Sequence, residues 1–149
     1  MKRYGLVGYP LGHSFSQKYF SEKFEGLNIS HSHTYHVFEL ESLSDFPDIW
    51  DCHPDLEGVN VTIPYKIEIM PFLDEIDVSA AGVKAVNVIK KKGNKLIGYN
   101  SDVFGFKQSL YAWLMGVEVE ALIFGSGGSS LAVQVGLQAL NIPFKIVSR

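Results

Sequence analysis

The amino-acid sequence predicts an α/β fold, because short apolar runs that end at turn residues alternate with stretches of helical spacing. The clearest case is the apolar run 121–124, a glycine-rich turn, a helical stretch over about 130–140, and a second apolar run at 144–147. This order has the length that a right-handed βαβ crossover needs. Of the 149 residues, 46% are hydrophobic and 19% are charged, which is typical of a globular protein.

Charge and cysteine content exclude several classes of protein. The net charge is −3 with both signs interspersed, so nothing favours binding to nucleic acid or to an anionic membrane surface. Cys52 is the only cysteine, which excludes an internal disulfide framework and favours a reducing compartment. No apolar run is long enough to cross a bilayer. We therefore expect a cytoplasmic protein that binds neither nucleic acid nor membranes.

The N-terminal region predicts a buried strand followed by a helix. Residues 4–9 form a short apolar run that Pro10 closes, and a helix opens at 14–16 and ends at Gly26. Ser14 or Ser16 is a natural N-cap for this helix. Both hydroxyls would then lie beside exposed N–H groups, where a carboxylate or phosphate is stabilised. Capping alone is the other interpretation.

A second strand is expected at 33–40, followed by a short helix over 42–50. The histidines at 31, 33 and 36 raise the question of a metal site. On a strand, however, His33 and His36 point to opposite faces, and no nearby cysteine or carboxylate completes a ligand set. We therefore predict no metal site.

Residues 58–66 predict a strand that runs into a helix. Apolar residues alternate with Asn60 and Thr62, so these two polar side chains share one face. Pro64 ends the strand and suits the first turn of a helix, which places Lys66 in that turn. Polar groups at such junctions are where α/β proteins place their chemistry. The alternative is an amphipathic strand followed by a solvated lysine.

A hairpin is expected next, with strands at 85–89 and 96–100, and then a helix over 103–114. Asn87 lies within the first of these strands. Asp102 directly precedes the helix, where an acidic side chain interacts favourably with the helix dipole.

The glycine-rich turn resembles a dinucleotide-binding fingerprint. Gly125 permits a tight turn, and Gly127 lets the backbone approach a pyrophosphate at the helix N-terminus. The match is incomplete, because Ser130 stands where the third glycine falls. The following strand ends in Ser148 and Arg149, where NAD sites place an acidic residue. A cation there suits a 2′-phosphate, so NADP is favoured over NAD.

Five segments together resemble the shikimate dehydrogenase family, in the same order and over the whole chain. They are GYPLGHSFS at 8–16, GVNVTIPYK at 58–66, AVN at 85–87, NSDVFGF at 100–106 and GSGGS at 125–129. The resemblance implies reduction of 3-dehydroshikimate to shikimate with NADP, in aromatic amino-acid biosynthesis. It also implies a substrate-binding α/β domain, expected at 1–114, followed by a Rossmann-type NADP-binding domain. Residues 115–149 would supply the first βαβ unit of that second domain.

The resemblance also implies roles for individual residues. Ser14 and Ser16 would hold the substrate carboxylate, and Lys66 and Asp102 would be the catalytic pair. Such a pair fits carbonyl reduction, since the oxygen that gains negative charge must receive a proton. The remaining substrate-binding residues would be Asn60, Thr62, Asn87 and Ser101, the last standing where the family usually has threonine. The cofactor-binding residues would be Gly125, Ser126, Gly127, Gly128, Ser129 and Arg149.

Members of the family usually extend well beyond this length. We therefore expect a fragment with poor turnover, which self-associates through an incomplete Rossmann half whose apolar sheet surfaces lack cover. Two alternatives stay open. One is a quinate/shikimate dehydrogenase that uses NAD, and the other is a non-catalytic binder of cyclic hydroxy acids. Retention of both Lys66 and Asp102 favours an enzyme over a binder.

Overall fold

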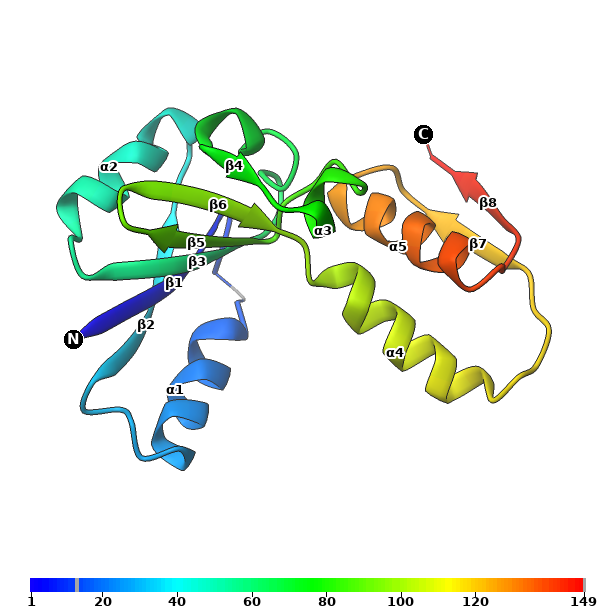
Figure 1. The fold of residues 1–149 in the computed structure, drawn as a ribbon, viewed down its shortest axis with the longest axis horizontal. Helices are drawn as coiled ribbons and strands as arrows, with labels where there is room; N and C mark the ends of the chain where they lie inside the picture. Colours follow the sequence, from blue (N-terminus) through cyan, green and yellow to red (C-terminus); the bar gives the residue numbers. More distant parts are fainter. Residues whose placement is uncertain (13, 149) are drawn as a thin grey trace.

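The computed structural model describes residues 1–12 and 14–148, which form two lobes joined through helix α4 (Figure 1). The larger lobe contains a six-stranded sheet of order β2-β1-β3-β5-β6-β4. Its strands are β1 (Lys2–Gly8), β2 (His33–Glu39), β3 (Leu56–Val61), β4 (Glu75–Ile76), β5 (Val88–Lys92) and β6 (Lys95–Tyr99). The smaller lobe contains β7 (Ala121–Phe124) paired in parallel with β8 (Phe144–Val147). The α/β class is confirmed.

The helices of both lobes connect and cover these strands (Figure 1). They are α1 (Ser16–Gly26), α2 (Phe46–Cys52), α3 (Val78–Ala81), α4 (Asp102–Leu114) and α5 (Gly128–Ala139), with 3₁₀ turns at Leu43–Asp45 and Met70–Phe72. None in the described part of the chain is both long and apolar enough to cross a membrane.

The sheet of the larger lobe is mixed. Strand β1 pairs in parallel with β2 and β3, whereas β5 runs antiparallel to both β3 and β6. The carboxyl ends of β1, β2 and β3 therefore lie at the same edge. Loops at such an edge are the usual location of ligand sites in α/β proteins.

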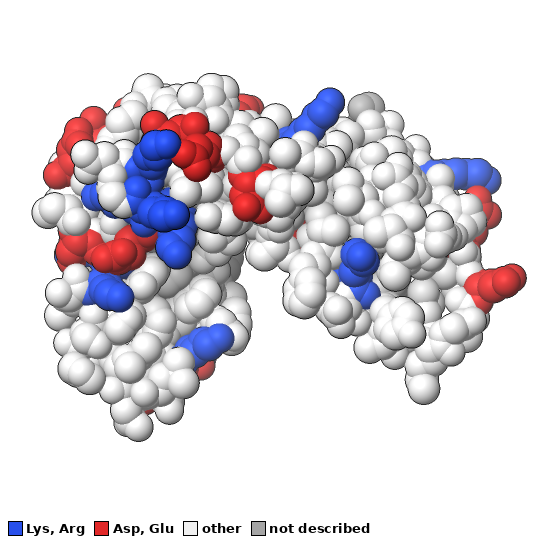
Figure 2. All heavy atoms as spheres, in the orientation of Figure 1, with Lys and Arg blue, Asp and Glu red and all other residues white. Residues whose placement is uncertain are grey.

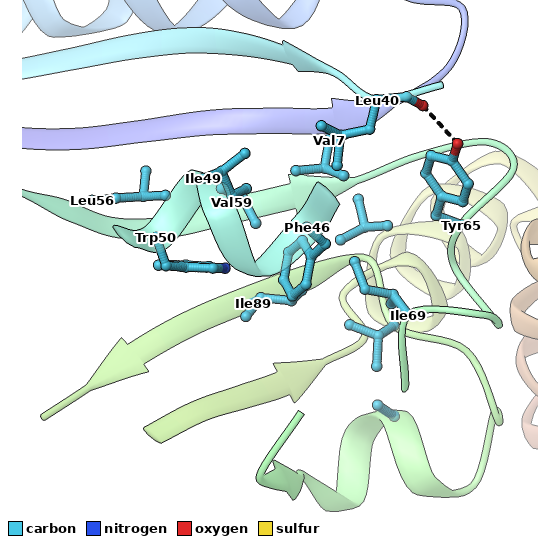
Figure 3. Close-up of a cluster of buried hydrophobic side chains, with 13 residues drawn as sticks. Val7, Leu40, Phe46, Ile49, Trp50, Leu56, Val59, Tyr65, Ile69 and Ile89 are labelled. Carbon is cyan, nitrogen blue, oxygen red and sulfur yellow. Dashed lines mark hydrogen bonds between the residues drawn. The ribbon is translucent and has the colours of Figure 1, made fainter. Parts of the chain in front are cut away.

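The main core lies on the face of the sheet that α2 covers (Figure 3). Phe46 and Ile49 of α2 pack there against Val59 and Ile89 of the sheet. The Tyr65 hydroxyl donates a hydrogen bond of 2.6 Å to the Leu40 carbonyl, as the dashed line in Figure 3 shows. Burial of so many large apolar side chains supplies the main driving force for folding of this lobe.

Helix α1 covers part of the opposite face. Leu6 lies in a second cluster together with Tyr35, whereas its neighbour Val7 belongs to the main core, as the alternation of a strand requires. Phe20 of α1 stacks on Tyr35, with ring centroids 4.4 Å apart and planes 12° apart. This contact fixes the N-terminal part of α1 against β2.

The smaller lobe has the predicted βαβ arrangement. Helix α5 connects the two parallel strands, and Leu137 of α5 and Ile123 of β7 are buried. Helix α4 packs on α5 so closely that a Cβ built on Gly136 would lie 2.6 Å from the Phe106 ring. Leu122 and Phe124 of β7 are exposed.

The prediction of a helix after Pro64 is wrong. Residues 63–69 form successive turns, with no regular helix before the 3₁₀ turn Met70–Phe72. The reason is competition for one backbone group, because the Lys66 carbonyl accepts a 2.7 Å hydrogen bond from Val86 N–H. Pro71 also lacks the backbone N–H that a continuous α-helix would pair with the Ile67 carbonyl.

The expected first strand of the hairpin is shifted. The strand begins at Val88 and continues to Lys92, so Asn87 lies just before it. Asn87 nevertheless keeps ladder-like backbone bonds, donating to the Tyr99 carbonyl at 3.0 Å and accepting from Val61 N–H at 2.8 Å. Its backbone is therefore hydrogen-bonded on both sides, like that of a strand residue.

Candidate functional site

A cavity of about 790 Å³ opens at the carboxyl ends of β1 and β3, where the loop before α1 faces the start of α4. Figure 2 shows a deep notch between the two lobes. Residues predicted for the site from sequence make up much of the polar lining: Ser14, Ser16, Asn60, Thr62, Lys66, Asn87 and Asp102. Segments far apart in the sequence thus meet in one cavity.

Lys66 and Asp102 form the central ion pair. Lys66 Nζ donates to Asp102 Oδ2 at 2.7 Å, and 14% of the lysine side chain and 32% of the aspartate side chain are exposed. The other carboxylate oxygen, Asp102 Oδ1, accepts a 2.6 Å hydrogen bond from Asn87 Nδ2. Both oxygens of Asp102 are therefore occupied, which holds the carboxylate and orients the ammonium group.

Ser101 holds the Asn87 side chain that binds Asp102. Its hydroxyl accepts a 3.0 Å hydrogen bond from Asn87 Nδ2, and its backbone N–H donates to Asn87 Oδ1 at 2.9 Å. It is not among the residues that line the cavity. The structure thus gives Ser101 a contact with Asn87 rather than a place on the cavity surface.

Sequence reasoning missed Asn100. Its side chain is buried, and Oδ1 accepts hydrogen bonds from the backbone N–H groups of Asp102 and Val103 at the start of α4. Its Nδ2 donates to the Ala85 carbonyl at 2.9 Å. An asparagine just before a helix is a capping signal, which could have identified it. Asn100 thereby fixes the first turn of the helix that carries Asp102.

The prediction that Ser14 or Ser16 is the N-cap of α1 is wrong. Phe15 occupies the cap position in a helical conformation, with φ −75° and ψ −21°, and Ser16 is the first helical residue. Ser14 Oγ still accepts a 3.3 Å hydrogen bond from Ser16 N–H. Both serines line the cavity, so the helix N-terminus faces it as expected.

Tyr35 is a second residue that sequence reasoning missed. Its hydroxyl donates a 2.8 Å hydrogen bond to Asn60 Oδ1, although Tyr35 itself does not line this cavity. Burial raises the pKa of Tyr35, and a hydrogen bond with the Ser16 side chain acts in the opposite direction. No periodicity in the sequence separates this tyrosine from an ordinary core aromatic residue.

The glycine-rich turn reaches the lysine. Lys66 Nζ donates a 3.1 Å hydrogen bond to Ser129 Oγ, and a Cβ built on Gly128 would lie only 2.8 Å from Lys66 Cβ. Gly125 adopts φ +110°, which favours glycine. Space is open around Gly127, and Ser126 is exposed. Arg149 lies outside the described residues.

Within residues 1–12 and 14–148, no group of three or more His, Cys, Asp or Glu side chains is arranged to hold a metal ion. His33 Nδ1 instead lies 2.9 Å from Ser32 Oγ.

The fold and the cavity define an α/β protein with a polar ligand site beside a glycine-rich βαβ unit. Residues 6–89, more than half of the chain, match the family model of the shikimate dehydrogenase substrate binding domain. The chain belongs to that family.

The relatives agree with this assignment. The shikimate dehydrogenase (NADP(+)) of Bacillus subtilis strain 168 is 39% identical over 136 residues, which cover 89% of this chain and 48% of that protein. The one from Halothermothrix orenii is 43% identical, with coverages of 87% and 45%. The chain thus spans about half the length of the curated relatives that it matches.

Solved structures show the same fold. Shikimate dehydrogenase 1 from Peptoclostridium difficile superposes with a TM-score of 0.82 at 36% identity, covering 99% of this chain and 56% of that one. The Thermus thermophilus enzyme in complex with NADP(H) and shikimate gives a TM-score of 0.87 at 27% identity, with coverages of 100% and 56%.

Proposed function

We propose that this chain provides the substrate site and the start of the cofactor site of an NADP-dependent shikimate dehydrogenase, which interconverts 3-dehydroshikimate and shikimate. The observation that carries the proposal is the Lys66–Asp102 pair, which lies in a polar cavity. Asn87 donates to the carboxylate oxygen of Asp102 that Lys66 does not contact. The names of the relatives, shikimate dehydrogenase (NADP(+)), support both the substrate and the cofactor.

The cavity offers donors for each polar part of such a substrate. Ser14 and Ser16 at the N-terminus of α1 suit the carboxylate, because that end of a helix favours negative charge. Asn60 and Thr62 at the end of β3 suit the ring hydroxyls. Through its contact with Asn87, Ser101 would act on the substrate indirectly.

Lys66 would exchange the proton at the reacting oxygen. Reduction adds a hydride to the carbonyl carbon, and the Lys66 ammonium group would give one proton to the oxygen that becomes the hydroxyl. In the reverse direction the neutral amine would accept that proton. Asp102 would hold the ammonium group in place through its 2.7 Å contact.

The smaller lobe fits the start of an NADP site. The open space around Gly127 and the N-terminus of α5 would accept a pyrophosphate, with Gly125, Ser126, Gly128 and Ser129 completing the turn. The reduced cofactor, NADPH, would supply the hydride when bound, and NADP+ would accept it in the reverse direction. Arg149 remains a prediction for the 2′-phosphate, and so does the preference over NAD.

We also propose the domain boundary after Leu114, at the end of α4, because the six-stranded and two-stranded sheets lie on either side of it. Self-association would use the exposed β7 side chains Leu122 and Phe124. The cytoplasm is the proposed compartment, consistent with the single, exposed Cys52.

Calorimetric titration with shikimate tests the proposed site directly. We expect saturable binding with one site per chain, weakened by Ser16→Ala and by Asn87→Ala. Absence of binding at millimolar shikimate would refute the proposal.

NADPH oxidation in the presence of 3-dehydroshikimate, measured for the parent-length protein, separates an enzyme from a binder. An enzyme would show a rate above background that Lys66→Ala abolishes. Shikimate binding without any NADPH oxidation would instead support the non-catalytic alternative.

A further inference from the structure

Tyr35 connects two walls of the cavity without lining it. Its side chain is on β2 and only 5% of the residue is exposed. The hydroxyl donates to Asn60 Oδ1 on β3 at 2.8 Å, and the Ser16 side chain at the start of α1 interacts with the phenol so as to lower its pKa. One buried hydroxyl is therefore bonded directly to a residue of the proposed substrate site and is influenced by a second one.

The direction of the hydrogen bond to Asn60 follows from the protonation state of the Tyr35 phenol. Burial raises the pKa of Tyr35, so the hydroxyl keeps its proton at neutral pH. The interaction with the Ser16 side chain lowers the pKa of Tyr35, against this rise. The proton of Tyr35 is then available for Asn60.

This bond determines which end of the Asn60 amide meets a ligand. An asparagine side chain has one acceptor, Oδ1, and one donor group, Nδ2. Oδ1 is occupied by Tyr35, whereas no group in residues 1–12 and 14–148 accepts a hydrogen bond from Asn60 Nδ2. Because Asn60 lines the cavity, the unoccupied donor is the part of the amide left for a ligand oxygen.

The tyrosine is itself held in place. Phe20 stacks on its ring at a centroid distance of 4.4 Å, and Leu6 and Leu11 are buried beside it. A side chain packed in this way has little rotamer freedom to lose when the ligand binds. Its hydroxyl can therefore fix the Asn60 amide before the ligand arrives.

We propose that Tyr35 is a positioning residue of the substrate site. Its hydroxyl holds the Asn60 amide so that Nδ2 is presented as a donor to a hydroxyl oxygen of a polyhydroxylated ring. This orientation disfavours ligands that offer only a donor at that point. This inference rests on the proposed function, since it takes shikimate as the ligand.

Tyr35→Phe is the direct test, because it removes the hydroxyl and keeps the ring that stacks on Phe20. We expect affinity for shikimate, measured by calorimetry on the 149-residue chain, to fall roughly three- to tenfold. Tyr65→Phe is the matched control. That hydroxyl is also buried and hydrogen-bonded, at 2.6 Å to the Leu40 carbonyl, but its partner Leu40, unlike Asn60, does not line the cavity.

Both variants should have a lower melting temperature, but only Tyr35→Phe should lose affinity for shikimate. That outcome supports a positioning role over a structural one. The double variant with Asn60→Ala provides a second readout. Tyr35→Phe should cost no further affinity in that background, because the amide that it positions is gone.

Three results would overturn the inference. They are equal affinity of Tyr35→Phe and wild type, equal loss of affinity in Tyr65→Phe, and additive losses with Asn60→Ala. Each leaves the proposed function intact, since wild type still binds shikimate. Failure of wild type to bind shikimate would refute the proposed function and this inference together.

Discussion

Lys66 uses two of its three N–H groups on the protein. Nζ donates to Asp102 Oδ2 at 2.7 Å and to Ser129 Oγ at 3.1 Å, and an ammonium group has three donors. The remaining donor is left for a ligand at the cavity, which Lys66 lines. An ammonium group held by two fixed acceptors is well placed to transfer its third proton to one site.

Lys66→Met should separate chemistry from binding. It keeps most of the length of the side chain and removes the ammonium proton, so NADPH-dependent turnover should fall by about 10²–10⁴-fold. Shikimate affinity should change much less, since the other polar contacts remain. Steady-state kinetics and calorimetry measure the two effects. A variant that keeps a tenth or more of the wild-type turnover would show that Lys66 does not supply the proton.

At the scale of elements, the glycine-rich turn is a contact surface as well as a candidate phosphate site. Gly128 lies against Lys66, so the N-terminus of α5 abuts the segment that follows β3. Gly127, one residue earlier, has open space around it. Two adjacent glycines of the same turn therefore have different neighbours, and they can be tested against each other.

Gly128→Ala should disturb this contact. The new methyl group would lie 2.8 Å from Lys66 Cβ, an atom close to the backbone that cannot move alone. We expect a loss of about 1–3 kcal/mol in the free energy of unfolding, from overpacking, and weaker shikimate binding. Denaturant titration and calorimetry measure both.

The control is Gly127→Ala, where no atom lies within 4 Å of the added Cβ. It should cost at most about 1 kcal/mol, the scale of an N-cap change, and leave shikimate affinity unchanged. Equal effects of the two substitutions would show that the turn does not press on Lys66.

Local patterns in the sequence predicted the elements well where the structure is locally determined. The strands at β1, β2, β7 and β8 follow from apolar runs and alternation, and α1 and α4 follow from helical spacing. The segment after Pro64 failed because the Lys66 carbonyl bonds to Val86 N–H, twenty positions along the chain. No local pattern contains that partner.

The site shows the same division. Ser14, Ser16 and Asp102 could be proposed from helix starts alone, and Lys66 from its place after a strand. Their convergence on one cavity came from the resemblance to a family, not from spacing. The contact of Tyr35 with Asn60 was invisible, because it depends on which side chain lies opposite in the folded sheet. Asn100 has a local signal, its place just before a helix, but its bond to the Ala85 carbonyl has none.

At the scale of the whole molecule, charge near β2 makes folding sensitive to acid. Burial is the main cause that lowers the pKa of His36, and the positive charges of Arg3 and His53 lower it further, against the opposing carboxylate of Asp55. The unfolded chain therefore binds a proton at a higher pH than the folded chain does. The stability that neutral His36 contributes is present above the ordinary pKa of 6.5 and is lost as the pH falls below it.

Urea unfolding at pH 7 and pH 5 checks this expectation. The free energy of unfolding should fall between these pH values, and His36→Gln should make that fall smaller because it cannot take up the proton. His31→Gln serves as the control, since it changes a histidine of the neighbouring segment. An identical decrease in wild type and His36→Gln would contradict the assignment.

Helix α4 is attached to the larger lobe at its first residue and to the smaller lobe along its body. Its first residue, Asp102, is tied to Lys66 and Asn87, while its body packs on α5 through Phe106. Thirteen residues of helix are about 20 Å long, so a swing of a few degrees about the first turn moves the far end by an ångström or more. The carboxylate at the fulcrum hardly moves in such a swing. A rotation of the smaller lobe about this first turn would therefore leave the acid of the proposed catalytic pair in place beside its lysine, and would change the Ser129 contact with Lys66 instead.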